Sequence, residues 1–189
     1  MVKKKSGYVV AILGATGAVG KETLEILEER KFPLASLHLF ASKRSAGEMM
    51  SCQGKEWKVE ELTPESSFAG VDFAFISATD AISREYGQRL GADGVVVIDD
   101  SGVFRMEVDV PLVVPEVNAH ALTTMPRGIV SIPNCTTTPL VMALKPLQDA
   151  VGVKRVVVTT FQSVSGTGAA AMEMDTRSAQ DMVNRNSHQ

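Results

Sequence analysis

Apolar runs and amphipathic stretches alternate along the first half of the chain. Residues 8–13, 71–76 and 95–98 are almost continuously apolar and rich in β-branched or aromatic side chains, which is typical of strands buried on both faces of a parallel sheet. Residues 37–41 predict a further strand, and residues 19–30 carry apolar side chains at helical spacing. This order of strands and helices indicates an α/β fold built on a doubly wound parallel sheet.

Three weaker patterns accompany these elements. Alternating residues over 49–61 predict a hairpin, and residues 81–90 predict a helix that is closed by Gly91. Residues 111–118 contain two prolines, which restrict the residues before them, so this segment is expected to be extended, with a short helix after it. The sheet is expected to be complete before residue 128.

The second part of the chain begins at a predicted domain boundary, which divides it into residues 1–128 and 129–189. Its predicted elements are a strand over 128–132, a helix over 140–150, a strand over 153–161, a small-residue turn over 162–168 and a helix over 169–184. Pro146 predicts a kink or a stop near Lys145. About 60 residues with so few strands bury too little surface to stand alone. We therefore expect the incomplete start of an α+β domain, in a chain that continues or borrows surface from a partner.

Three glycines at a spacing of three follow the first predicted strand. The segment has the pattern G-x-x-G-x-x-G and comprises Gly14, Ala15, Thr16, Gly17, Ala18, Val19 and Gly20. Such glycines allow a tight turn and bring backbone close to a pyrophosphate, which lies at the N-terminus of the following helix. The pattern therefore predicts a Rossmann-type dinucleotide site, with a ligand-free strand-to-helix turn as the alternative.

The end of the second predicted strand bears on the choice of cofactor. NAD sites usually offer an acidic residue there for the ribose 2′-hydroxyl, whereas the first carboxylate in this chain is Glu48. Arg44 and Ser45 instead suit a 2′-phosphate, which an acidic residue would repel. The sequence therefore predicts NADP, with a solvated basic loop as the alternative.

Other candidate site residues follow the later strands. Loops at the carboxyl ends of strands face the ligand crevice in open α/β sheets, which makes Ser77, Ala78, Ser101 and Arg105 candidates. Cys135 follows a short strand and precedes a helix, where unpaired backbone N–H groups favour the reactive thiolate. A buried structural thiol is the alternative for Cys135, and we expect that role for Cys52.

Charge and cysteine content narrow the range of partners. The chain of 189 residues has 19 basic and 22 acidic residues, a formal net charge of −3, which argues against broad binding of nucleic acid or an anionic membrane. Its 2 cysteines form no disulfide framework, so reduced thiols in a cytoplasmic protein are the simpler expectation. The apolar run over 8–13 is too short for a signal peptide, and no run approaches the roughly 20 apolar residues of a membrane span.

Five segments together resemble aspartate-semialdehyde dehydrogenases. They cover nearly the whole chain in the family's order and comprise residues 14–20, 42–47, 109–118, 133–137 and 162–168. The resemblance implies an NADP-dependent enzyme, with no metal, that interconverts aspartyl β-phosphate and aspartate β-semialdehyde plus phosphate. It also implies a catalytic and dimerisation domain after the Rossmann domain, a homodimer or homotetramer, and a place in lysine, threonine, methionine and diaminopimelate biosynthesis.

The resemblance also implies roles for individual residues. Thr16, Gly17, Ala18 and Val19 match the loop that holds the pyrophosphate, and Arg44 and Ser45 match the contacts to the 2′-phosphate. Cys135 matches the nucleophile that forms a thioester, with Asn134 beside it as a hydrogen-bond partner of the substrate or intermediate. Arg105 matches the residue that binds the transferred phosphate, Gln162 a substrate-binding glutamine, and Ser165 and Gly166 backbone contacts near the nicotinamide.

The sequence departs from the family's pattern in two ways. Asp100 stands where the family usually has asparagine, so a carboxylate near Arg105 is expected to weaken phosphate binding unless it points away. The family's later substrate arginine and base histidine have no counterpart, and His38, His120 and His188 lie in none of the expected positions. We therefore expect this chain alone to be inactive or nearly so. A related acyl-phosphate reductase, such as N-acetyl-glutamyl-phosphate reductase, and a non-catalytic NADP-binding paralogue remain alternatives.

Overall fold

The structure is a computed structural model that describes residues 4–162 and Met174. The chain divides into two compact units, Met1–Val153 and Lys154–Gln189, and each is described by itself. Within the described residues, no helix is both long and apolar enough to cross a membrane.

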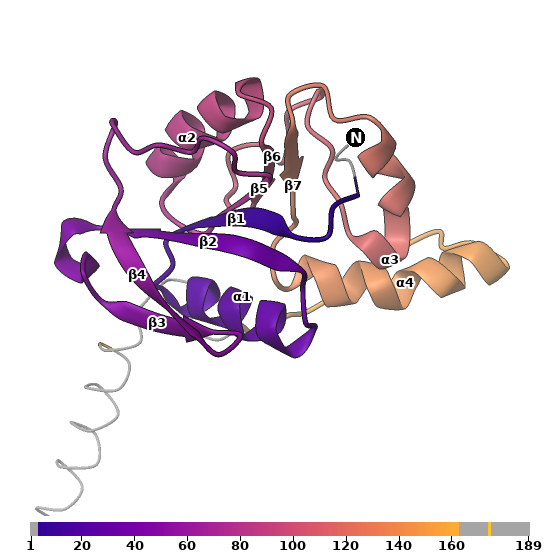
Figure 1. The fold of residues 1–189 in the computed structure, drawn as a ribbon. Coiled ribbons are helices and arrows are strands. Elements are labelled where there is room, and N and C mark those ends of the chain that lie inside the picture. Colours follow the sequence, from indigo (N-terminus) through magenta and orange to yellow (C-terminus); the bar gives the residue numbers. More distant parts are fainter. Residues whose placement is uncertain (1–3, 163–173, 175–189) are drawn as a thin grey trace, which may run out of the picture. The chain divides into compact units, whose positions relative to one another are not determined.

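The first unit is built on a seven-stranded sheet in the order β3-β4-β2-β1-β5-β6-β7 (Figure 1). The strands are β1 (Tyr8–Leu13), β2 (Leu34–Ala41), β3 (Met49–Cys52), β4 (Lys55–Glu61), β5 (Phe73–Ile76), β6 (Val96–Asp99) and β7 (Ile129–Ser131). All neighbouring strands are parallel except β3, which pairs antiparallel with β4. The structure confirms the expected α/β class and the hairpin over residues 49–61.

Helices cover both faces of this sheet. They are α1 (Ala18–Glu29), α2 (Asp80–Ala92), α3 (Pro115–Asn118) and α4 (Thr137–Val151), with 3₁₀ helices η1 (Lys43–Ser45) and η2 (Ala119–Thr123). In β1, Val10 and Ile12 belong to the core cluster that contains Leu24 and Leu27 of α1. The intervening residues Ala11 and Leu13 belong to the opposite cluster, which contains Tyr86 and Leu90 of α2. Because successive strand residues point to opposite faces, a central strand with a helix on each side must be apolar throughout.

The sheet extends further than the sequence predicts. β7 pairs in parallel with β6, with Val97 opposite Ile129 and Asp99 opposite Ser131. The expectation that the sheet is complete before residue 128 is therefore wrong, since a three-residue strand gives too weak a local signal to predict its neighbour. The division into domains at residue 128 stays a prediction.

Two proline positions also differ from expectation. Pro115 begins α3 instead of continuing an extended segment, because the first helical position needs no N–H donor. Asn118 supports this short helix, as its Oδ1 accepts from Val114 N at 2.9 Å. We expected a kink or a stop near Lys145. α4 continues through Pro146 to Val151, so the stop is wrong, and the kink stays a prediction. Pro146 is exposed, and the carbonyl that loses its partner there can be solvated.

The described part of the second unit, residues 154–162 and Met174, contains no strand. The strand expected over 153–161 is therefore not formed: Val157 is 80% exposed and Phe161 is 97% exposed. A strand needs a hydrogen-bonded neighbouring strand, and no strand is assigned to residues 153–161. The predicted helix over 169–184 and turn residues 163–168 lie outside the described residues.

Candidate active site

The glycine turn lies between the ends of two strands that flank β1. The backbone N–H groups of Gly14 and Ala15 both donate to the Phe40 carbonyl of β2, at 2.8 and 3.0 Å. Gly14 has a φ of +90°, and a Cβ there would lie 2.1 Å from the Ser77 carbonyl oxygen beyond β5. The turn therefore sits where the strand order reverses, at the carboxyl edge, which is the usual crevice for a ligand in such sheets.

The helix that follows begins with exposed backbone. Gly17 is the N-cap of α1 and makes no side-chain cap hydrogen bond, and Ala18 and Val19 are exposed. A Cβ at Gly20 would lie 2.3 Å from the Gly14 carbonyl oxygen, so this glycine allows the helix to start directly against the turn. The N–H groups in the first turn of a helix lack intrahelical acceptors and carry partial positive charge. These residues, with Thr16 beside them, fit the pyrophosphate of a dinucleotide.

The carbonyl of Phe40, near the end of β2, accepts the hydrogen bonds of the glycine turn. The basic loop begins two residues later, so it lies next to this turn. Arg44 is exposed in η1, whereas Ser45 is only 7% exposed. Ser45 N donates to the Ser42 carbonyl at 2.9 Å, which closes η1. Arg44 is thus available to an anionic ligand, and contact of Ser45 with a 2′-phosphate stays a prediction.

The loop after β6 is organised by a buried carboxylate. Asp99 is fully buried, and its Oδ1 accepts from the backbone N–H and the hydroxyl of Ser101 at 3.1 and 2.6 Å. The Ser101 hydroxyl in turn accepts from Val103 N at 3.1 Å. Ser101 was predicted to face the ligand, but it is buried and its hydroxyl is engaged inside the loop.

This loop brings Arg105 back to the edge of the sheet. Its Nη2 donates to the Asp100 carbonyl at 2.7 Å, and its Nε donates to the Ile132 carbonyl at 2.9 Å. Ile132 follows β7 directly and precedes Cys135 by three residues. Arg105 therefore joins the loop after β6 to the segment that carries the cysteine.

Cys135 is exposed in the first turn leading into α4. The Oδ1 of Asn134 accepts from Thr136 N at 3.0 Å and from Thr136 Oγ1 at 2.8 Å, and the Cys135 thiol lies 3.7 Å from the same oxygen. The Asn134 carbonyl accepts from Thr137 N at 2.9 Å and from Thr138 N at 3.2 Å. Asn134 thus acts as a cap that holds the cysteine at the helix start.

Asp100 lies in the same loop after β6 and is half-buried. Burial raises its pKa, and the charge of Asp99 raises it further. A hydrogen bond from the Ser77 side chain and the charge of Arg105 oppose this shift by lowering the pKa. The printed contact between Asp100 and Arg105 is made by the backbone carbonyl of Asp100, so the expected effect of its carboxyl group on phosphate binding stays a prediction.

The other cysteine and the described histidines lie away from Arg105 and Cys135. Cys52 is fully buried, as expected, and burial followed by the charge of Glu28 raises the pKa of its thiol. His38 lies in β2, with its Nδ1 3.9 Å from Glu60 Oε1, and His120 lies in η2. Neither histidine belongs to the loops that carry Arg105 and Cys135. Gln162 lies in the second unit, and Ser165, Gly166 and His188 lie outside the described residues.

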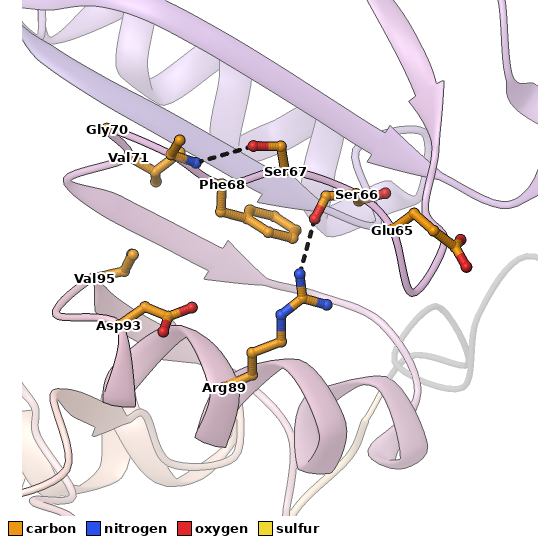
Figure 2. Close-up of a pocket in the computed structure, with 10 residues that line it drawn as sticks. Glu65, Ser66, Ser67, Phe68, Gly70, Val71, Arg89, Asp93 and Val95 are labelled. Carbon is orange, nitrogen blue, oxygen red and sulfur yellow. Dashed lines mark hydrogen bonds between the residues drawn. The ribbon is translucent and has the colours of Figure 1, made fainter.

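A cavity of about 460 Å³ lies at the opposite edge of the sheet, where β5 and β6 begin (Figure 2). Arg89 reaches across it and donates to the carbonyls of Pro64 and Ser66 at 2.8 and 3.0 Å. Its guanidinium also lies 5.8 Å from the ring centroids of Phe68 and Tyr86. These contacts hold the loop before β5, so the cavity is separate from the edge that carries Cys135.

Two protein-family models match the sequence. "Semialdehyde dehydrogenase, NAD binding domain" matches residues 9–125, and "Semialdehyde dehydrogenase, dimerisation domain" matches residues 144–188. The aspartate-semialdehyde dehydrogenase of Aquifex aeolicus is 52% identical over 168 residues, which are 88% of this chain and 49% of the relative. That of Bacillus subtilis is 42% identical over 179 residues, which are 95% of this chain and 51% of the relative. The chain thus spans about half the length of the curated relatives it matches.

Solved structures of aspartate semialdehyde dehydrogenases are also similar to this chain. Aspartate semialdehyde dehydrogenase II from Vibrio cholerae, complexed with ASA, has a TM-score of 0.91 at 42% identity and covers 95% of this chain and 54% of its own. Aspartate semialdehyde dehydrogenase with NADP from Candida albicans has a TM-score of 0.67 at 29% identity and covers 78% of this chain and 48% of its own. The fold and the order of its elements are therefore shared along most of the chain.

Proposed function

Because the chain belongs to the aspartate-semialdehyde dehydrogenase family, we propose that it is the cofactor-binding part of an NADP-dependent oxidoreductase that converts aspartyl β-phosphate to aspartate β-semialdehyde. One observation carries the proposal: the glycine turn, Arg105 and Cys135 all follow parallel strands at the carboxyl edge of one sheet. The reaction belongs to the biosynthesis of lysine, threonine, methionine and diaminopimelate. We place it in the cytoplasm, in a homodimer or homotetramer that uses residues 144–188.

The cofactor is held by the first part of the chain. Gly14, Gly17 and the start of α1 bind the pyrophosphate, and Arg44, with Ser45, binds the 2′-phosphate. Arginine matches a phosphate with two parallel hydrogen bonds, and Arg44 is exposed beside the glycine turn. When bound, the nicotinamide supplies the hydride, and we assign Ser165 and Gly166 to its surroundings.

The chemistry on the substrate begins at Cys135. Its sulfur forms a bond to the acyl carbon as the bond from that carbon to the phosphate oxygen breaks, and the phosphate leaves with the electron pair toward Arg105. This covalent step divides a difficult reaction into two easier ones. Asn134 holds the helix start, and so the sulfur, in position, and Gln162 binds the rest of the substrate.

In the second step Cys135 would hold the acyl group as a thioester for reduction by the hydride that the bound cofactor would supply. Cleavage of the carbon–sulfur bond then releases the aldehyde and returns the thiolate of Cys135. The thiol proton must be removed before the first step, and proton transfer of this kind contributes about 10²–10⁴-fold. The described histidines, His38 in β2 and His120 in η2, lie outside the loops that carry Arg105 and Cys135, and we assign the base to neither of them.

Cofactor choice is tested by titrating the chain with NADP and NAD in a calorimeter. Arg44→Ala should weaken NADP binding by about 10- to 100-fold and leave NAD binding unchanged, since a charge-assisted hydrogen bond contributes about 1.5–3 kcal/mol. Lys43→Ala, from the same turn η1, is the matched control and should cause a smaller loss. Equal binding of the two cofactors, or equal effects of the two variants, would contradict the NADP assignment.

The covalent step is tested by intact-mass spectrometry after exposure of the chain to aspartyl phosphate. One aspartyl group should be added, and Cys135→Ala should abolish the addition, whereas Cys52→Ala should not. N-acetyl-glutamyl phosphate is the competing acyl donor, and faster labelling by it would favour that reductase class. Absence of labelling by either donor would favour a non-catalytic paralogue.

A further inference from the structure

The carboxyl group of Asp99 shapes the loop that carries Arg105. It is fully buried, and its Oδ1 accepts from the backbone N–H and the hydroxyl of Ser101 at 3.1 and 2.6 Å. The Ser101 hydroxyl in turn accepts from Val103 N at 3.1 Å. Phe104, the next residue, is 1% exposed and belongs to the core on the α2 side of the sheet. Two side-chain-to-backbone turns and one buried ring therefore fix the backbone up to Arg105.

The backbone of the same aspartate holds the segment that leads to the cysteine. Ile132 N donates to the Asp99 carbonyl at 2.9 Å, directly after the paired residues of β6 and β7. The Ile132 carbonyl accepts from Arg105 Nε at 2.9 Å. These contacts form a closed ring, which runs from Asp99 through its loop to Arg105, on to Ile132 and back to Asp99. Cys135 follows Ile132 by three residues, so its backbone lies within about 11 Å of this ring.

Stability alone does not account for the burial of this carboxyl group. Among the described residues, Asp99 Oδ2 has no hydrogen-bond partner, and neither does the hydroxyl of Ser131, which lies opposite Asp99 in the ladder of β6 and β7. Burial of a polar atom without a hydrogen bond costs free energy, and an apolar side chain would avoid this cost. Such costs are typically retained at functional sites, which indicates a role for Asp99 in the geometry of the site.

We propose that Asp99 is a positioning residue, which holds the guanidinium of Arg105 in a fixed place next to the segment that carries Cys135. Asp99 is fully buried, so it acts through Ser101 and Arg105 without touching the substrate. The inference rests on the proposed function in one respect, that the anion Arg105 receives there is the phosphate of the substrate. A displaced guanidinium would bind this anion less well, because charge-assisted hydrogen bonds depend on distance and direction.

The position of the guanidinium is measured with two alkylating reagents. The thiolate of Cys135 displaces iodide from iodoacetate, which is an anion, and from iodoacetamide, which is neutral, so the ratio of the two rates cancels the thiolate fraction. Cys135 is exposed and Cys52 is buried, and peptide mass spectrometry identifies the labelled cysteine. At a fixed pH, Arg105→Gln should lower the ratio about two- to fivefold, because a positive charge within several ångströms is removed.

Substitutions of Asp99 separate its hydrogen bonds from its charge. Asp99→Leu removes the acceptor but keeps a side chain of similar size, and it should lower the ratio as far as Arg105→Gln does. The double variant should show no further fall, because both changes remove the same contact. Asp99→Asn keeps an oxygen for Ser101 and should retain the wild-type ratio. If Asp99 acted only through its charge, both substitutions would raise the ratio, and the inference would be wrong.

Two serine variants complete the comparison. Ser101→Ala leaves one of the two hydrogen bonds to Asp99, so it should lower the ratio by a smaller factor, and it replaces Asp99→Leu if that variant does not fold. Ser83 lies on α2, and its hydroxyl is also buried with no partner in the part of the chain that the structure describes. Ser83→Ala is therefore the matched control and should leave the ratio unchanged. Near-UV circular dichroism checks that each variant is folded.

Four results would overturn the inference. They are an unchanged ratio in Arg105→Gln, a wild-type ratio in both Asp99→Leu and Ser101→Ala, an equal fall in Asp99→Asn and Asp99→Leu, and an equal fall in Ser83→Ala.

A second experiment separates this inference from the proposed function. Inorganic phosphate should slow the reaction of Cys135 with iodoacetamide in the wild-type chain, and it should do so less in Asp99→Leu. If phosphate protects Cys135 in no variant, the wild-type chain included, the assignment of Arg105 to phosphate binding fails. The ratio of the two alkylation rates still decides whether Asp99 positions the guanidinium.

Discussion

Two helices of this chain begin at the same edge of the sheet but differ in how they are held. α1 follows β1 and buries Leu24 and Leu27 against the sheet, whereas α4 follows β7 and buries none of its described side chains. The N-terminus of α1 lies at the proposed cofactor site, and the N-terminus of α4 lies next to Cys135. The nucleotide side is thus supported by a packed core, while the thiol side depends on its first turn.

The glycine turn and Cys135 are therefore held in place by different kinds of contact. The glycine turn is fixed by backbone contacts to Phe40 and Ser77 and by the core on both faces of β1. Cys135 is fixed by the Asn134 cap and, through Ile132, by Arg105. Cofactor binding should therefore tolerate changes in α4, and thiol reactivity should respond to single hydrogen bonds.

The largest expected effect is in the core beneath α1. Leu24→Ala removes a side chain that is 4% exposed and should lower the free energy of unfolding by about 2–5 kcal/mol, because the cavity it leaves cannot collapse fully. Leu147→Ala in α4, at 53% exposure, is the matched control and should change it by less than about 0.5 kcal/mol. Urea unfolding measures both, and equal losses would show that α4 is packed as well as α1.

Gly14→Ala tests the contact that supports the nucleotide side. The new Cβ would lie 2.1 Å from the Ser77 carbonyl in addition to the strain of a positive φ, and we expect a loss of about 2–3 kcal/mol together with weaker NADP binding. Gly54→Ala also has a positive φ, +70°, but meets nothing within 4 Å, so it should cost about 1 kcal/mol. Calorimetric titration with NADP and thermal unfolding measure the two effects, and equal losses would refute the role of the Ser77 contact.

Asn134→Ala tests the cap that supports the thiol side. Removal of the Oδ1 acceptor should cost about 1 kcal/mol and change the rate at which iodoacetamide modifies Cys135, because the first turn becomes less ordered. Thr138→Ala, where only the backbone N–H contacts Asn134, is the matched control. Stability by circular dichroism and the alkylation rate are measured together, and an unchanged rate in Asn134→Ala would exclude the cap as a positioning group.

The smallest effect compares two ion pairs. Lys5 pairs with Asp72 at the amino edge of the sheet, and Lys145 pairs with Asp149 along α4. A hydrogen bond from Lys5 lowers the pKa of Asp72, so this pair stabilises the folded chain above the pKa of an unfolded aspartate, and the contribution disappears as the pH falls through the lower folded value. Asp72→Asn should cost about 0.5–1 kcal/mol at pH 7 and less at acidic pH, and Asp149→Asn about 0.3–0.5 kcal/mol. Urea unfolding at the two pH values measures this difference, and a loss of the same size at both would contradict it.

Local patterns predicted most of the first unit. The apolar run of β1 is buried on both faces because helices cover both, and Gly14 and Gly20 lie where a side chain cannot fit. A strand was also predicted over residues 128–132, and β7 forms within this range. Its pairing with β6 was not predicted, because three residues do not indicate which strand they join. Local patterns failed for residues 153–161, whose β-branched side chains favour a strand only when a neighbouring strand is available.

The α/β fold, the glycine turn after β1 and the position of Cys135 at the start of a helix could all be predicted from the amino-acid sequence. Each of these depends on residues that are close along the chain, through period, turn conformation or helix capping. The two hydrogen bonds of Arg105, to the carbonyls of Ile132 and Asp100, could not be predicted from the sequence. Those contacts depend on which strands lie side by side, because the pairing of β6 with β7 is what brings their two loops together.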